Sequence, residues 1–259
     1  MKRARWPAKF LLAFLLGLLA FAGTSHAADK PVVLFDQGHG QLFFADRGDS
    51  LDLSNLASLF EGEGFVVRIG KEPFNEKLLS GVDAVVISGP FRPLAPAEVD
   101  AVRTFLYRGG SLSIMLHIGQ PLADLLQGLE IAFSNGVIHE QDGIIDGEPI
   151  NFAVSYLKPH DLTKGLEGFN LYGGWALINT DDNSEIIAET GQAAWVDLNG
   201  DKKLSPGDAV QAFGVAIAGG FGQGRFVVFG DDAIFQNRFL EGPNVLLANN
   251  LVKWLKPLH

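Results

Sequence analysis

The sequence contains no cysteine. Disulfides and any cysteine nucleophile are therefore excluded, and so is the lipid anchor of a bacterial lipoprotein. Basic residues are also scarce, with 20 Lys and Arg against 30 Asp and Glu, which gives a net charge of −10. An acidic surface repels nucleic acids and anionic membranes, so we expect no nucleic-acid partner.

The sequence also lacks an apolar stretch long enough to span a membrane. Its longest apolar run, Phe10–Ala22, follows a basic start and precedes small residues up to Ala27, whereas a membrane-spanning helix needs roughly 20 residues. This pattern predicts a signal peptide over residues 1–27, cleaved near Ala27, and a periplasmic or secreted protein with no stable membrane anchor. An uncleaved anchor is the alternative. Cleavage would leave 16 basic and 30 acidic side chains, a net charge of −14.

Short apolar runs alternate with helical patterns along the rest of the chain. We expect one α/β domain over residues 28–259, with a mostly parallel sheet and helices on both faces. The predicted strands are 31–35, 65–69, 84–87 and 111–116, a later hairpin joins 210–218 to 225–229, and the predicted helices are 51–60, 95–108 and 244–255. Residues 131–208 form an elaboration whose topology the pattern leaves open.

Three segments carry a resemblance to a known family. They are Asp36-Gln-Gly-His-Gly40, Gly109-Gly-Ser-Leu-Ser-Ile-Met-Leu-His117, and the stretch from Gly222 through Gly-Asp231-Asp to Asn237. In this order they resemble the class I glutamine amidotransferase-like fold, a flavodoxin-like three-layer sandwich, in its non-catalytic branch. Within that branch they look like exported relatives of the auxiliary proteins of gliding-motility-type ABC transporters. His160–Gly165 is similar to a segment of the trehalose-utilisation branch.

The chain departs from the amidotransferases at their nucleophile. Those enzymes place a cysteine on the turn after the strand that here ends Met115-Leu-His117, and this chain has none. There is no Gly-x-Ser-x-Gly elbow to supply a serine instead. Glutaminase or protease chemistry through a thiol is therefore impossible, and the resemblance implies a pseudoenzyme.

Polar residues follow the predicted strands, where ligands bind in open parallel sheets. The candidate pocket residues are Asp36, His39, Ser88, His117, Asp231, Asp232 and Asn237. They could contact a ligand or act as weak acids and bases, and Asp36, His39, His117 and Asp231 could hold zinc, iron or manganese. The alternative is that the aspartates accept backbone N–H bonds and cap loops.

A second candidate is a calcium-type loop within the elaboration. Oxygen ligands recur at the spacing of such loops, in Asp197, Asn199, Asp201, Lys203 through its carbonyl, Ser205 and Asp208. The loop resembles the dockerin-type variant, although Lys202 occupies the position of the usual glycine. The pattern predicts a structural calcium ion, and a solvated Asn-Gly-Asp turn is the alternative.

These patterns favour an exported, non-enzymatic binding or scaffold domain with a structural calcium loop. Its partner, a protein or a small molecule, is not identified by the sequence, and we expect no nucleotide cofactor. One alternative is a metal- or water-dependent hydrolase that uses Asp36, His39, His117 and Asp231. Another is a carbohydrate-binding protein, which would need an exposed tryptophan or tyrosine beside the same cleft.

Overall fold

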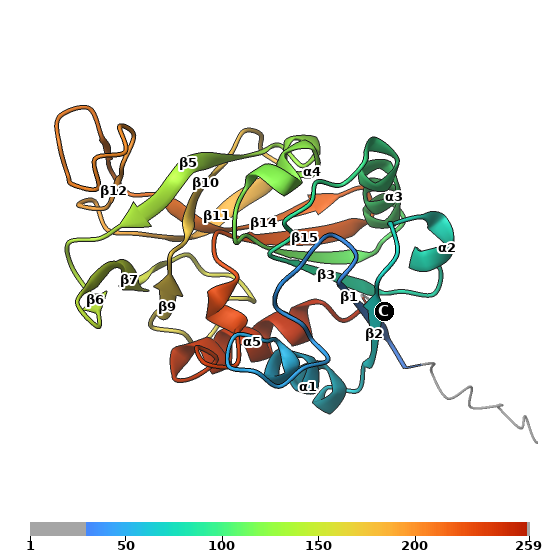
Figure 1. The fold of residues 1–259 in the computed structure, drawn as a ribbon. Helices are drawn as coiled ribbons and strands as arrows, with labels where there is room; N and C mark the ends of the chain where they lie inside the picture. Colours follow the sequence, from blue (N-terminus) through green and yellow to red (C-terminus); the bar gives the residue numbers. More distant parts are fainter. Residues whose placement is uncertain (1–29, 258–259) are drawn as a thin grey trace, which may run out of the picture.

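The computed structural model describes residues 30–257, so the predicted signal peptide lies outside the described residues. A 12-stranded sheet runs through the molecule (Figure 1). Five of its strands pair in parallel, in the order β15-β4-β3-β1-β2. They are β1 (Val32–Asp36), β2 (Val66–Gly70), β3 (Ala84–Ser88), β4 (Ser111–Met115) and β15 (Gly224–Phe229). Their carboxyl ends therefore meet at one edge of the sheet.

The other seven strands of this sheet pair antiparallel. They are β5 (Ile131–His139), β8 (Tyr156–Leu157), β10 (Trp175–Asn179), β11 (Ser184–Glu189), β12 (Trp195–Val196), β13 (Ala209–Val210) and β14 (Gly214–Phe221). A second, antiparallel sheet contains β6 (Ile144–Ile145), β7 (Glu148–Val154) and β9 (Phe169–Tyr172).

Helices are few. They are α1 (Ser54–Gly62), α2 (Glu76–Leu79), α3 (Pro96–Tyr107), α4 (Ala123–Gly128) and α5 (Pro243–Trp254), with 3₁₀ turns η1 (Gln120–Leu122) and η2 (Ala233–Phe235). Side chains of α2, α3 and α4 pack on one face of the large sheet, and those of α1, α5 and the second sheet pack on the other. The prediction of a mostly parallel three-layer sandwich with helices on both faces is therefore wrong, because seven of the twelve strands pair antiparallel and the few helices share the cover of one face with the second sheet.

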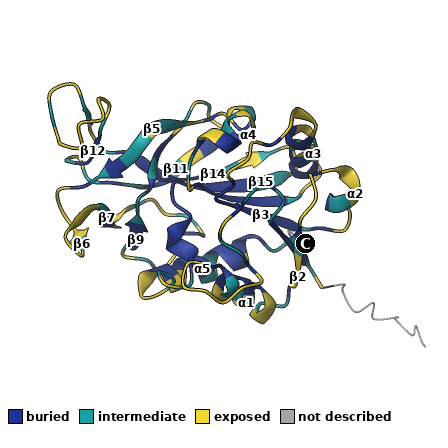
Figure 2. Ribbon diagram, viewed as in Figure 1, coloured by how far each residue is buried: buried dark blue, intermediate teal, exposed yellow. Residues whose placement is uncertain are grey.

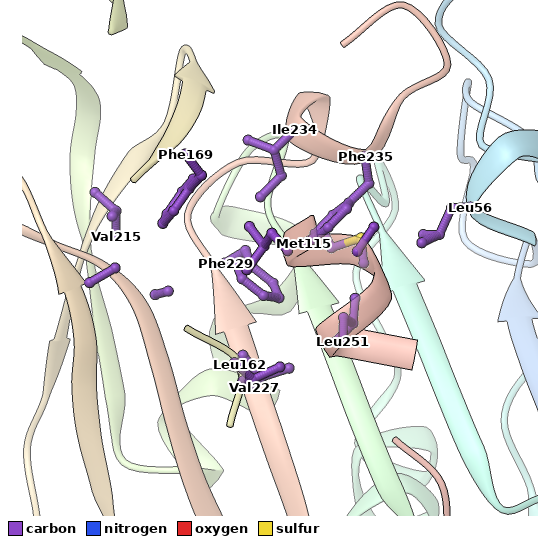
Figure 3. Packing of buried hydrophobic residues seen from close by; sticks show 14 of the residues in the cluster. Leu56, Met115, Leu162, Phe169, Val215, Val227, Phe229, Ile234, Phe235 and Leu251 are labelled. Atoms are coloured by element: carbon purple, nitrogen blue, oxygen red, sulfur yellow. The ribbon is translucent and has the colours of Figure 1, made fainter. Parts of the chain in front are cut away.

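The core extends along both faces of the sheet, so the central strands are buried from end to end (Figure 2). Phe229 of β15 packs edge-on against Phe235 of η2, with ring centroids 5.1 Å apart. Met115 and Leu251 lie beside this pair (Figure 3). Strands buried on both faces read as continuous apolar runs, which is why β1, β3 and β4 stand out in the sequence.

Proline and glutamate determine where α3 begins. Pro96 occupies the first turn, where its missing N–H costs nothing, and Glu98 Oε2 accepts the backbone N–H of Ala95 at 2.8 Å. Glu98 is thereby fixed at the start of the helix, next to the end of β1. Within residues 30–257, no helix is both long and apolar enough to cross a bilayer.

Candidate functional site

The strand-end residues predicted from the sequence do follow neighbouring parallel strands. Asp36 ends β1 and Ser88 ends β3, while His117 comes just after β4 and Asp231 and Asp232 just after β15. Ser88 lies opposite Met115, which in turn lies opposite Phe229. Hydrogen bonding nevertheless divides the candidates into separate clusters rather than one pocket.

The first group, here called the buried histidine cluster, consists of Asp36, His39, Gln41 and Glu98. His39 Nδ1 lies 2.8 and 2.9 Å from the two carboxylate oxygens of Asp36, and its Nε2 lies 2.8 Å from Glu98 Oε1. Gln41 closes the loop, since its amide donates to Asp36 and its carbonyl oxygen accepts the His39 backbone N–H at 2.8 Å. All four side chains are buried.

Two carboxylates thus occupy both nitrogens of the His39 ring, which favours the doubly protonated imidazolium. Burial lowers the pKa of His39, but the hydrogen bonds and charges of Asp36 and Glu98 outweigh burial and raise it overall. The ring also stacks on Phe74, with centroids 5.2 Å apart. His39 therefore ties the β1 loop to the start of α3 and has no nitrogen left to act as a base.

The second group, the His117 dyad, consists of His117 and Asp232. His117 Nδ1 lies 3.1 Å from Asp232 Oδ1, and the side chains are 40% and 2% exposed respectively. The hydrogen bond that His117 donates to Asp232 raises the pKa of His117 more than burial lowers it. Asp232 Oδ2 is buried without a partner among the described residues. The dyad therefore presents an anchored imidazole whose other nitrogen makes no hydrogen bond within residues 30–257.

Apolar and aromatic side chains surround the His117 ring. The rings of Phe43 and Phe91 have centroids 5.3 and 5.2 Å from it, and Trp175 donates its indole N–H to the His117 carbonyl oxygen at 2.9 Å. Leu42 is 60% exposed and Phe91 37% exposed. We call His117, Phe43, Phe91 and Trp175, together with Leu42, the exposed chain neighbour of Phe43, the His117 surface.

The two clusters are joined through the backbone. The N–H groups of Phe91 and Arg92 both donate to the His39 carbonyl oxygen, at 3.0 and 2.9 Å. The loop after β3 thus rests on the loop after β1 and carries Phe91 to the His117 ring. The buried histidine cluster supports the His117 surface without being part of it.

Three other candidate residues, Asp231, Asn237 and Ser88, belong to neither cluster. The carboxylate oxygens of Asp231 accept backbone N–H bonds from Tyr172 at 2.6 Å and Ala233 at 2.8 Å. Burial, reinforced by the charge of Asp232, raises the pKa of Asp231 to about 8. Asn237 accepts the Asn55 N–H at 2.9 Å at the start of α1. Ser88 Oγ is buried and has no partner among the described residues.

The predicted calcium loop is closed by its own backbone. Asp197 accepts N–H bonds from Asn199, Gly200 and Lys202, and Asp208 accepts those of Leu198 and Ser205. Among residues 30–257, no group of three or more His, Asp or Glu side chains is arranged to hold a metal ion. These contacts describe an acidic turn, and nothing among them supports the predicted calcium ion.

The sequence did not reveal several residues that contact His39 or His117. Glu98 was assigned only to a helix start, and Gln41, Phe43 and Phe91 were not singled out. The loop that carries Gln41 and Phe43 gives a weak signal in retrospect, because Gln-Leu-Phe-Phe places three apolar residues, one exposed and two half-buried, directly after a glycine-rich turn. Exposed apolar residues grouped in a loop are a signal of binding.

Several solved structures share this fold. The mmIFT52 N-terminal domain is 17% identical, with a TM-score of 0.69, and the match covers 86% of this chain and 96% of that one. Cytoplasmic Protein STM1381 from Salmonella typhimurium LT2 is 14% identical over 87% of this chain and 99% of that one, with a TM-score of 0.55. A ThuA-like protein from Parabacteroides merdae is 13% identical over 87% and 90%, with a TM-score of 0.51.

At these identities the likeness concerns the fold alone. ThuA-like proteins have a class I glutamine amidotransferase-like fold, but nothing in these similarities points to gliding-motility transporters, so that part of the resemblance is wrong. One relative is named cytoplasmic, and the similarities lend no support to a signal peptide, calcium or a pseudoenzyme. No known family model matches the chain. No curated protein sequence matches it either, so the chain is placed by its fold and not by a family.

Proposed function

We propose that this protein is a non-enzymatic binding domain that receives its ligand on the His117 surface. One observation carries the proposal: an exposed imidazole is anchored at Nδ1 by a buried carboxylate and faced by two phenyl rings. An exposed group of apolar side chains around one fixed polar donor is typical of a recognition surface.

The surroundings of His117 indicate the chemistry of the ligand. With Nδ1 bonded to Asp232, the remaining nitrogen of the imidazolium is a charged N–H donor, which prefers a carboxylate or phosphate oxygen. Phe43 and Phe91 offer apolar contact on the sides of the ring, and Leu42, next to Phe43 in the chain, is exposed. The ligand class that fits is therefore an anionic group carried next to an apolar one.

The hydrolase alternative finds less support. It required Asp36, His39, His117 and Asp231 to act together, but His39 is held between two carboxylates and both oxygens of Asp231 accept backbone N–H bonds. The carbohydrate-binding alternative lacks a specific observation in its favour.

The test uses phenylacetate as probe and its neutral analogue phenylacetamide as the comparison. Histidine ring resonances are followed by NMR at pH 6 in the wild type, in His117→Gln and in the control His160→Gln. We expect a saturable shift of the His117 signals with phenylacetate, a weaker one with phenylacetamide, no binding to His117→Gln and unchanged binding to His160→Gln. Binding should weaken as the pH rises through the raised pKa of His117.

Two results would count against the proposal. One is the absence of a saturable shift with phenylacetate in the wild type. The other is turnover of chromogenic esters, phosphate esters or glycosides that disappears in His117→Gln, because that outcome would establish the hydrolase instead.

A further inference from the structure

A groove lies between α2 and α3, and none of its lining residues belongs to the His117 surface. Its volume is about 630 Å³, within the range of roughly 300–1,000 Å³ of small-molecule sites. Asp83, just before β3, and Gly110, just before β4, both line it. The groove thus opens at the amino ends of the parallel strands, at the opposite edge of the sheet from His117.

The floor of the groove is apolar. Phe74, Leu79, Val82 and Phe105 line it and are each less than a tenth exposed. Ala97 and Ala101 of α3 add small side chains to the wall. A ligand with an apolar body would bury its surface here against side chains that are already packed, so the floor needs little rearrangement.

The rim of the groove is negatively charged. Its charged residues are Glu76, Asp83, Asp100 and Arg108. Arg108 and Glu76 neutralise each other in an ion pair of 2.8 Å. Asp83 accepts the Val32 N–H at 2.7 Å, and Asp100 is exposed and makes no ion pair within the described part of the chain. The rim therefore carries two uncompensated negative charges.

The carboxyl end of α3 adds to the negative charge of the rim. Arg108 and Gly109, directly after its last residue Tyr107, line the groove together with Thr104 and Phe105. The carboxyl end of a helix carries a partial negative charge and favours cations within its last turn. The helix end and the carboxylates therefore both favour a cationic ligand, whereas the His117 surface fits an anionic one.

We propose that this groove binds a small organic cation, an amine or guanidine joined to an apolar body. The apolar part lies on Phe74 and Phe105, and the cationic head lies toward Asp83 and Asp100. This second site is independent of the proposed function, because it uses another edge of the sheet and another ligand charge.

Phe74 supplies a readout inside the protein. Its ring forms part of the groove floor and stacks on His39, and its backbone N–H donates to Glu98 at 2.9 Å. A ligand that contacts Phe74 therefore changes the magnetic environment of the His39 ring. Surface association elsewhere on this acidic protein would leave His39 unchanged.

The experiment titrates the protein with phenethylammonium and with the neutral, equally sized 2-phenylethanol, followed by NMR. We expect saturable shifts at Ala101, Thr104 and the His39 ring, with the cation binding more tightly than the alcohol. Asp100→Asn should weaken the cation by up to about fivefold, the effect of one partly exposed charge pair, and leave the alcohol unchanged. Asp124→Asn removes an exposed acid of α4 outside the groove and serves as the matched control.

A blocking variant completes the design. Ala97→Phe places a large side chain at an exposed position in the wall, and it should abolish binding of both probes, whereas His117→Gln should leave both unchanged. Equal affinity for amine and alcohol, insensitivity to Asp100→Asn, or shifts confined to the His117 surface would each overturn the proposal.

Discussion

Replacing His39 by leucine should destabilise the fold strongly. The change keeps most of the side-chain volume but leaves the buried carboxylates of Asp36 and Glu98 without the imidazolium that contacts both at 2.8–2.9 Å. Breaking a buried ion pair by removing one partner costs about 3–5 kcal/mol. Because the backbone N–H groups of Phe74 and Ala95 still donate to Glu98, we expect the lower end, about 3 kcal/mol.

The pH dependence of this effect has a definite sign. The folded pKa of His39 is raised above its usual 6.5, so the native state holds the proton more tightly than the unfolded chain. The stability it contributes is complete below pH 6.5 and is lost as the pH rises through the folded pKa. The gap in unfolding free energy between wild type and His39→Leu should therefore be wider at pH 6.5 than at pH 9.

Urea unfolding, monitored by tryptophan fluorescence at several pH values between 6.5 and 9, measures this gap. His139→Leu is the matched control, because His139 stacks on Trp195 at 4.1 Å but its Nδ1 is buried without a partner in the described part of the chain. Its cost in unfolding free energy should be smaller than that of His39→Leu. A His39→Leu variant within about 1 kcal/mol of the wild type, or a gap that stays constant or widens toward pH 9, would refute the ion-pair interpretation.

Three further changes have expected outcomes. In Gly89→Ala the new Cβ would lie 2.5 Å from Asp232 Oδ2, at a backbone φ of +49°. We expect the free energy of unfolding in urea to fall by about 3 kcal/mol. The pKa of His117 measured by NMR should also fall, because Asp232 is displaced. Asn244 is fully buried and bonds to the backbone of Asn170, Ile234 and Phe239. Asn244→Ala should therefore lower the free energy of unfolding by about 3 kcal/mol in the same assay. Because the loop from Asp197 to Asp208 is closed by its own hydrogen bonds, melting temperatures in calcium and in chelator should agree within about 1 °C; a clear rise with calcium would contradict this.

The parallel half of the sheet could be predicted because its strands are buried on both faces and end in glycine turns. The pattern predicts β1, β3, β4 and α3 to within a few residues. The antiparallel half could not be predicted in the same way. Strands such as β8 and β12 are two residues long, too short for any periodicity, and their partners are distant in sequence. The topology of residues 131–208 was left open, and this segment supplies most of the antiparallel strands, so the prediction of a mostly parallel sheet was wrong.

The sequence predicted the individual residues of the candidate site but not which of them lie together. His39 and His117 both follow the appropriate strands, and nothing local distinguishes the buried ring from the exposed one. The distinction comes from Glu98, which is 59 positions from His39 and looks in the sequence like an ordinary first-turn acid of a helix. Asn237 was included for its position after β15, yet it reaches back to the start of α1.

The position of β15 next to β4 has a consequence for how the protein forms. Met115 pairs with Phe229, so the parallel strands β4-β3-β1-β2 join the antiparallel half of the sheet only after the whole segment between β4 and β15 has been synthesised. Contacts between such distant parts of a chain form late and slowly. His117 and Asp232 follow these same two strands, so no nascent or truncated chain that ends before β15 contains the dyad. In a refolding experiment, the NMR signal of His117 bonded to Asp232 would therefore report completion of the sheet. Ligands of His117 would bind only to fully assembled molecules.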